Sequence, residues 1–196
     1  LEIGKGDALT VDAALSASGP WNINGGSLTA GTLTIADGAD VTLTNSKLNG
    51  DIEFAADADA ELSLTESTVA GNVTLSGADN SLFVKDSAIE GTLAAEVGEI
   101  HFGGENSFGG LDLTGDVEVF GTIAVKGKLE VEGGFNLADF SSLSTTEGLF
   151  VNGGTANLAG TVTQGGDVTL TGTDEDSTLS GTIETDLTLD NAQLSS

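Results

Sequence analysis

The side chains able to do chemistry in this 196-residue chain are almost all carboxylates. The sequence holds 31 Asp and Glu residues against five Lys, no Arg, one His and no Cys, for a formal net charge of −26. Paired carboxylates can hydrolyse a glycosidic bond when they flank it at a defined separation. Clustered carboxylates can bind calcium. These two chemistries are the ones that the residue types leave open.

The paired carboxylates do not predict an enzyme. Asp57/Asp59 and Glu130/Glu132 each lie two residues apart and so share one strand face, but this spacing is common on any solvated acidic strand. A lyase that acts on uronates would need cations to hold its polyanionic substrate, and this chain has few. We therefore expect no enzymatic activity, no catalytic residues and no small-molecule substrate.

A calcium site is the one metal site that the sequence leaves open. Asp174, Glu175 and Asp176 follow one another in a turn-like segment, where their oxygen atoms could ligate calcium or simply face solvent. His101 is the only histidine, so one chain holds no His-based triad and no multi-histidine site. It alternates with Ile100 and Phe102, which predicts that it faces outward. We expect no other cofactor.

The charge also excludes classes of partner. A strongly acidic surface repels nucleic acid and anionic lipid, so neither is expected to bind. No uninterrupted apolar run is long enough for a transmembrane helix. The first ten residues lack the basic and apolar regions of a signal peptide, and the chain resembles a segment of a longer protein.

An internal repeat predicts the secondary structure on which these charged residues lie. The segments that begin at Val41, Leu62, Leu82 and Ile100 are alike, and their serines recur every 20–21 residues, at Ser46, Ser67, Ser87 and Ser107. Glycines follow at the same period, at Gly50, Gly71 and Gly91. A fixed period of this length indicates stacked repeats that bury their apolar faces against one another.

Within each repeat, apolar residues alternate with polar ones, as in half-buried strands. The apolar pairs are Leu33/Ile35, Val41/Leu43, Leu62/Leu64, Val73/Leu75, Leu82/Val84, Ile100/Phe102, Leu111/Leu113, Val117/Val119, Leu129/Val131, Leu149/Val151, Val168/Leu170 and Leu187/Leu189. Three short strands separated by corners close one turn in about 20 residues. We therefore predict an all-β protein, a single-stranded parallel β-helix of about ten rungs in a single domain over residues 1–196.

The repeat is weakest over residues 111–148, where we expect either irregular rungs or a protruding loop. Trp21 follows the only Pro and could cap the N-terminal end of the core or stand exposed as a platform for carbohydrate. The pattern ends partway through a unit after Leu189, which predicts further chain or a docked copy at that end.

The block that runs from Leu43 to Ile52, and again from Leu62 to Val73 and from Leu82 to Leu93, resembles the passenger domains of bacterial autotransporters. It is most similar to the AIDA-type self-associating adhesins, and the segments 24–35 and 151–162 resemble their "NGG-T" rungs. The resemblance implies a right-handed β-helix displayed at the outer surface of a bacterial cell. It also implies a role in adhesion, self-association and biofilm formation.

These observations lead to one expected function and one alternative. We expect a non-enzymatic, secreted adhesin or stalk segment that binds a second copy or a surface receptor through the side of the rod. The alternative is a structural subunit that stacks end to end into a filament or surface layer.

Overall fold

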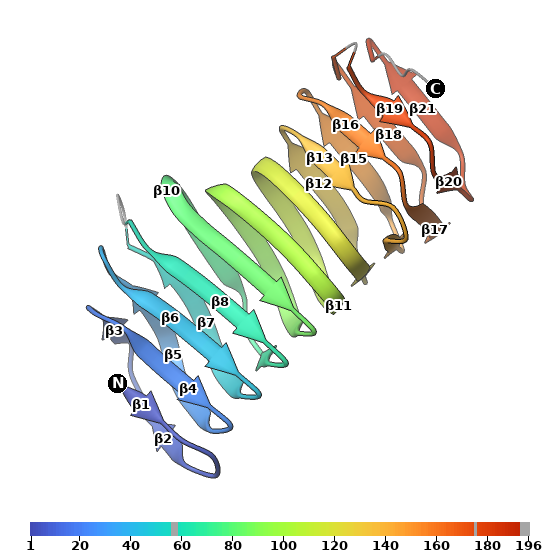
Figure 1. The fold of residues 1–196 in the computed structure, drawn as a ribbon. Coiled ribbons are helices and arrows are strands. Elements are labelled where there is room, and N and C mark those ends of the chain that lie inside the picture. Colours follow the sequence, from blue (N-terminus) through green and yellow to red (C-terminus); the bar gives the residue numbers. More distant parts are fainter. Residues whose placement is uncertain (56–58, 175, 193–196) are drawn as a thin grey trace.

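The protein is a rod of stacked parallel strands (Figure 1). The computed structural model describes residues 1–55, 59–174 and 176–192, and over these residues it contains strands and turns but no helix. The chain winds through about nine turns at a spacing of roughly 20 residues. The predicted parallel β-helix is confirmed, with a rung count close to the predicted ten.

Each turn contributes strands to three sheets that run along the rod. Sheet 1 contains β1 (Glu2–Ile3), β4 (Trp21–Asn24), β6 (Asp40–Thr44), β8 (Glu61–Thr65), β13 (Phe135–Leu137), β16 (Ala156–Leu158) and β19 (Thr178–Leu179). Sheet 2 contains β2 (Ala8–Thr10), β9 (Thr68–Val69), β14 (Ser142–Thr145), β17 (Thr161–Gly165) and β20 (Thr182–Ile183). Sheet 3 contains β3 (Leu15–Ala17), β12 (Lys128–Glu132), β15 (Gly148–Asn152), β18 (Val168–Thr171) and β21 (Leu187–Asp190).

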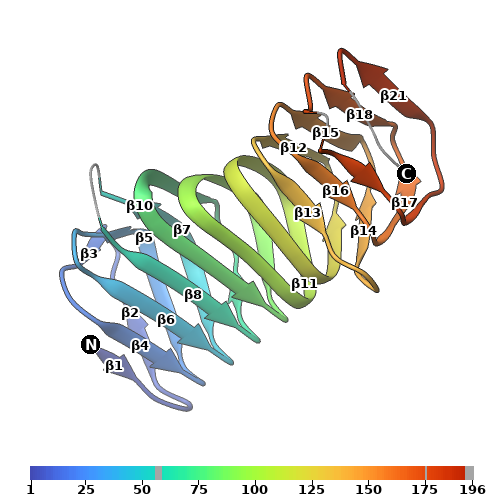
Figure 2. The same ribbon diagram turned by 45° about the horizontal axis from the view of Figure 1, so that its top comes forward.

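The remaining strands are long enough to turn a corner of the rod. β5 (Ser27–Ile35) and β7 (Lys47–Phe54) pass from sheet 2 to sheet 3, and β10 (Val73–Lys85) passes from sheet 3 to sheet 1. β11 (Ala88–Val125) stays extended through several corners and wraps around the middle of the rod (Figure 2). It therefore contributes to all three sheets.

The alternation of apolar residues places one column of side chains above another inside the rod. Leu43 pairs with Leu64, and Leu64 pairs with Val84, so residues of similar type stack from turn to turn. The core also holds Phe102 and Phe108, whose rings meet edge to face with centroids 5.3 Å apart. The predicted inward pairs are buried except for the last one, because no described turn covers Leu187 and Leu189.

The corner between sheets 1 and 2 is fastened by buried serines. The Ser46 backbone N–H donates to Ser67 Oγ at 3.1 Å, and the Ser67 N–H donates to Ser87 Oγ at 3.0 Å. Each of these hydroxyls donates in turn to a nearby backbone carbonyl, as Ser67 does to Thr65 O at 2.8 Å. The ladder satisfies backbone groups that would otherwise be buried without a partner.

The fourth serine of the predicted period does not belong to this ladder. Ser107 is exposed, and the buried Asn106 takes its place, since Asn106 Oδ1 accepts from the Ser87 N–H at 3.0 Å. The turn shortens here, because Leu82 pairs with Ile100 while Leu62 pairs with Leu82. The side-chain amide oxygen of Asn106 therefore extends the ladder in which the serine hydroxyl oxygens are the acceptors.

The recurring glycines lie at the corner between sheets 2 and 3. Gly50 has a φ of 147°, a conformation that favours glycine. All three are also confined by the preceding turn, because a Cβ on Gly50 would lie 2.1 Å from the carbonyl oxygen of Ala30, one on Gly71 would overlap that of Gly50, and one on Gly91 would lie 2.6 Å from that of Gly71. The backbones of successive turns thus approach closely at this corner.

The weakly repetitive segment from 111 to 148 continues the stack. Leu111 pairs with Leu129 and Val117 pairs with Phe135, so the turn measured at these two positions is shorter than the 20 residues between Leu62 and Leu82. Its one outward departure is the tight turn at Asp139 and Phe140, which follows β13 at the corner between sheets 1 and 2.

Candidate functional site

The carboxylate pairs considered for catalysis lie apart from one another. Asp57 lies outside the described residues, and the backbone N–H of Asp59 donates to Asp37 Oδ1 at 3.0 Å. Glu130 and Glu132 point outward from β12, and Glu130 forms an ion pair with Lys128. This hydrogen-bonded contact raises the pKa of the Lys128 ammonium above its ordinary value.

The candidate calcium turn is partly described. Asp174 accepts a hydrogen bond from Thr155 Oγ1, at 3.0 and 2.9 Å to its two carboxylate oxygens. Asp176 is exposed, and Glu175 lies outside the described residues. Over the described part of the chain, no group of three or more His, Cys, Asp or Glu side chains is placed to hold a metal ion.

Trp21 lies near the N-terminal end, where the sequence left two roles open. Its ring is partly buried and packs against the core, next to Val41 in the following turn. This position fits a cap on the core better than an exposed platform.

The acidic residues are distributed unevenly over the three outer faces. Sheet 3 is strongly acidic, and its outward strand positions include Asp51, Glu53, Glu96, Asp112, Glu130, Glu132 and Asp190 against Lys128. Sheet 1 is acidic, with Asp40, Glu61, Glu99, Asp116 and Glu118 against Lys85. Both faces therefore repel a second copy of themselves.

Sheet 2 has a nearly neutral outer face. Its charged side chains are Lys47, Glu90 and Glu105 at described outward strand positions, with Lys126 directly after β11 and Glu184 directly after β20. The other outward positions hold small uncharged side chains: Ala8, Thr10, Ser27, Thr29, Asn49, Thr68, Ala88, Ser107, Gly109, Thr122, Ala124, Ser142, Ser144, Thr161, Thr163 and Thr182. One side of a highly charged rod is thus flat, polar and close to neutral.

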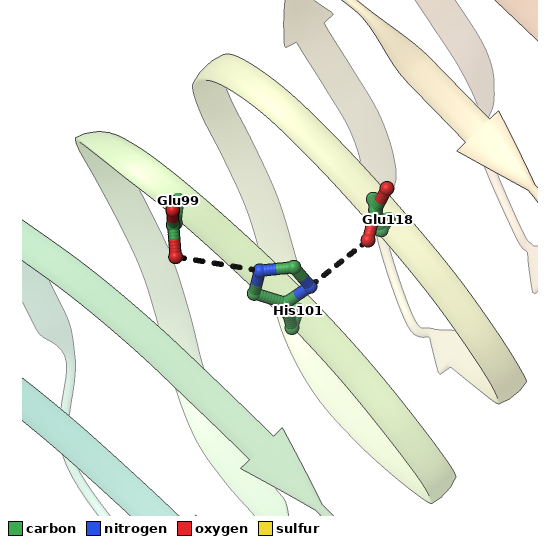
Figure 3. A network of polar contacts seen from close by, with 3 residues as sticks. All are labelled: Glu99, His101 and Glu118. Atoms are coloured by element: carbon green, nitrogen blue, oxygen red, sulfur yellow. Dashed lines mark ion pairs between the residues drawn. The ribbon is translucent and has the colours of Figure 1, made fainter.

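His101 faces outward from sheet 1, as predicted, and it lies in a small aromatic and ionic network (Figure 3). Its ring stacks on Phe83 of the preceding turn, with centroids 5.1 Å apart and planes 4° from parallel. Nδ1 lies 3.1 Å from Glu118 Oε2 in the next turn, and Nε2 lies 3.7 Å from Glu99 Oε2. The two carboxylates lie on opposite sides of the imidazole, so they hold its orientation rather than share a ligand with it.

A hollow opens beside this network on the outer face of sheet 1. Its lining includes Phe83, His101, Lys85 and Phe120. Gly103 lies between Lys85 and Phe120 along its row and leaves the space of about 390 Å³ open. Phe120 is 58% exposed, which is unusual for so large an apolar side chain.

Phe140 is the most exposed large apolar residue among those described. Its side chain is fully exposed, and its φ of 64° is rare for a bulky residue. The neighbouring Ser141 is buried, and its Oγ donates to Val119 O at 3.1 Å, which anchors the turn that presents the ring. Sequence reasoning missed this residue because the alternation does not extend into the turn.

Comparisons with known proteins return neither a family model, nor a curated protein, nor a solved structure that matches this chain. The described residues contain no helix long and apolar enough to cross a membrane. The class that the fold defines is therefore a parallel β-solenoid, and any function must be argued from its surface.

Proposed function

We propose that this protein is a non-enzymatic adhesin or stalk segment that acts outside the cell and associates with other copies through the side of its rod. The observation that carries the proposal is the neutral outer face of sheet 2 on a chain of net charge −26. The resemblance to autotransporter passengers supports the extracellular location and the adhesive role.

The physical argument rests on charge and shape. Two copies that met through sheet 3 would bring rows of carboxylates together, which costs several kcal/mol for juxtaposed like charges. Sheet 2 avoids this cost, and its small Ser, Thr and Ala side chains allow two strand faces to approach closely. Hydroxyl groups such as those of Ser142 and Thr122, which lie 3.1 Å apart within one rod, can also bond across the interface.

Matched charge substitutions test this proposal. Ser144→Glu with Thr161→Glu adds two carboxylates to sheet 2, whereas Thr169→Glu with Thr171→Glu adds the same charge to sheet 3. Analytical ultracentrifugation should show the sheet 2 variant associating at least about tenfold more weakly than the control. Equal weakening in both variants would show that net charge alone matters and would contradict a role for this face.

Electron microscopy of the unmodified protein distinguishes association through the side of the rod from the alternative, which is end-to-end stacking. Association through the side predicts short rods lying beside one another. Long single fibres would instead support a structural subunit of a filament or surface layer.

A further inference from the structure

We propose that Phe140 is an aromatic knob that inserts into the hollow between Phe83, His101 and Phe120 on a second copy of this chain. The inference rests on the proposed self-association and assigns it a specific contact. Phe140 is exposed and the hollow is open, so within one rod neither packs against another part of the described chain.

The knob is costly to the isolated rod in two ways. A fully exposed phenylalanine leaves its whole ring in water, and its positive φ adds backbone strain. The strain is maintained because Ser141 is buried beneath the turn and its backbone N–H donates to Ala138 O at 3.1 Å. A rigid turn thus holds the ring in a fixed position at the border of sheet 2.

The hollow has the properties of a receptor for an aromatic side chain. Its volume of about 390 Å³ falls within the range of ordinary binding pockets, and the rings of Phe83, His101 and Phe120 are among its lining. The contacts of the two ring nitrogens of His101 with Glu99 and Glu118 hold the imidazole in place, and Phe83 stacks against it. Aromatic rings attract one another at centroid distances of about 4.5–7 Å, so an inserted ring would find aromatic partners in the lining.

Charge favours a second copy of the chain as the occupant. The exposed Asp139 precedes the knob, and Lys85 forms the rim of the hollow. Lysine is scarce in this protein, with only five residues against 31 acidic ones, so few other places on the rod would attract Asp139. Docking of the ring would bring this opposite pair together.

The arrangement also determines the kind of assembly. Because the knob and the hollow are different patches, each rod can give its knob to one neighbour and receive the knob of another. Phe140 lies at the corner between sheets 1 and 2, so docking places this corner of one rod against the outer face of sheet 1 of its neighbour. A staggered row of rods follows from repeating this contact.

Binding strength provides the first test. Phe140→Asn suits the backbone, since Asn tolerates positive φ, and it removes no packing because the ring is fully exposed. Phe150→Thr is the control, because Phe150 is an outward phenylalanine on sheet 3. Sedimentation equilibrium should show an apparent dissociation constant about tenfold higher for Phe140→Asn and unchanged for the control.

The outcomes separate this inference from the proposed function. Association of Phe140→Asn at the strength of the unmodified protein would overturn the knob and leave self-association standing. A protein that stays monomeric without any substitution would overturn both.

Because the chain has no cysteine, introduced cysteines provide a second test. Asp139→Cys and Lys85→Cys are placed in separate chains with tags of different size, mixed and oxidised. Non-reducing electrophoresis should show the mixed disulfide in clear excess over that from Asp139→Cys mixed with Glu130→Cys, whose site lies on sheet 3. Equal yields would contradict the contact.

Discussion

At the scale of single residues, the serine ladder shows how a rod without disulfides fastens a corner. Ser46, Ser67 and Ser87 each accept from a backbone N–H of the turn before and donate to a carbonyl near their own position. The bonds join turns that hydrophobic packing alone would leave free to slide. They therefore help to set the register of the stack.

Ser67→Ala should destabilise the protein by about 1–3 kcal/mol, because it leaves the buried Ser46 N–H without an acceptor. Urea unfolding followed by circular dichroism would measure the loss. Ser63→Ala is the control, since Ser63 faces outward on β8, and it should change stability by less than about 0.5 kcal/mol. Equal stability of both variants would show that water or a shifted carbonyl replaces the hydroxyl.

The ladder also shows what residue-level reading of the sequence achieves. The recurrence of the first three serines could be read from their spacing, but their hydrogen bonds to the neighbouring turn come from the structure. Ser107 could not be assigned correctly, because the repeat is identified by its serines. The structure instead keeps a side-chain oxygen that accepts from the backbone N–H of the turn before. Asn106 supplies an equivalent oxygen in a turn two residues shorter than the one before it.

At the scale of elements, the glycine column permits the tight bend between sheets 2 and 3. Gly71→Ala should destabilise the rod by about 2 kcal/mol or more, since the new Cβ would overlap the backbone of the turn before it. Gly19→Ala is the control, because a Cβ there meets nothing within 4 Å. Thermal unfolding compares the two, and a Gly71→Ala variant as stable as its control would show that the corner can widen.

The strands themselves were largely predictable, because alternation identifies inward residues without knowledge of their neighbours. What alternation does not provide is the pairing between turns. Phe83 and His101 lie 18 residues apart and look unrelated in the sequence, yet they stack because their strands are adjacent in sheet 1. The hollow beside them depends on the same register and could not have been found from the sequence.

At the scale of the whole molecule, the charge is concentrated on two of three faces. Each rod carries a net charge of −26, so copies repel one another at a distance even if they meet through sheet 2. The neutral face becomes visible only after the outward residues of about nine turns are assigned to the three sheets. Composition predicts that copies repel one another, but it does not show that the outer face of sheet 2 carries little net charge.

Added salt should therefore strengthen association. Ionic strength of about 0.15 M shortens the screening length to about 8 Å, compared with about 30 Å at 0.01 M, so distant carboxylates cease to repel. Light scattering at fixed protein concentration should rise as sodium chloride is added across this range. Scattering that fell with salt would indicate that attractive ion pairs dominate the interface.

The spacing of the ladder contacts has a consequence for how the rod is made. Ser46 bonds to Ser67 and Ser67 bonds to Ser87, so each turn depends on the turn next to it and on no distant part of the chain. A chain that emerges gradually from a ribosome or a pore can complete one turn as soon as the next has appeared. Growth of the rod can thus proceed in step with the delivery of the polypeptide, each finished turn serving as the template for its successor.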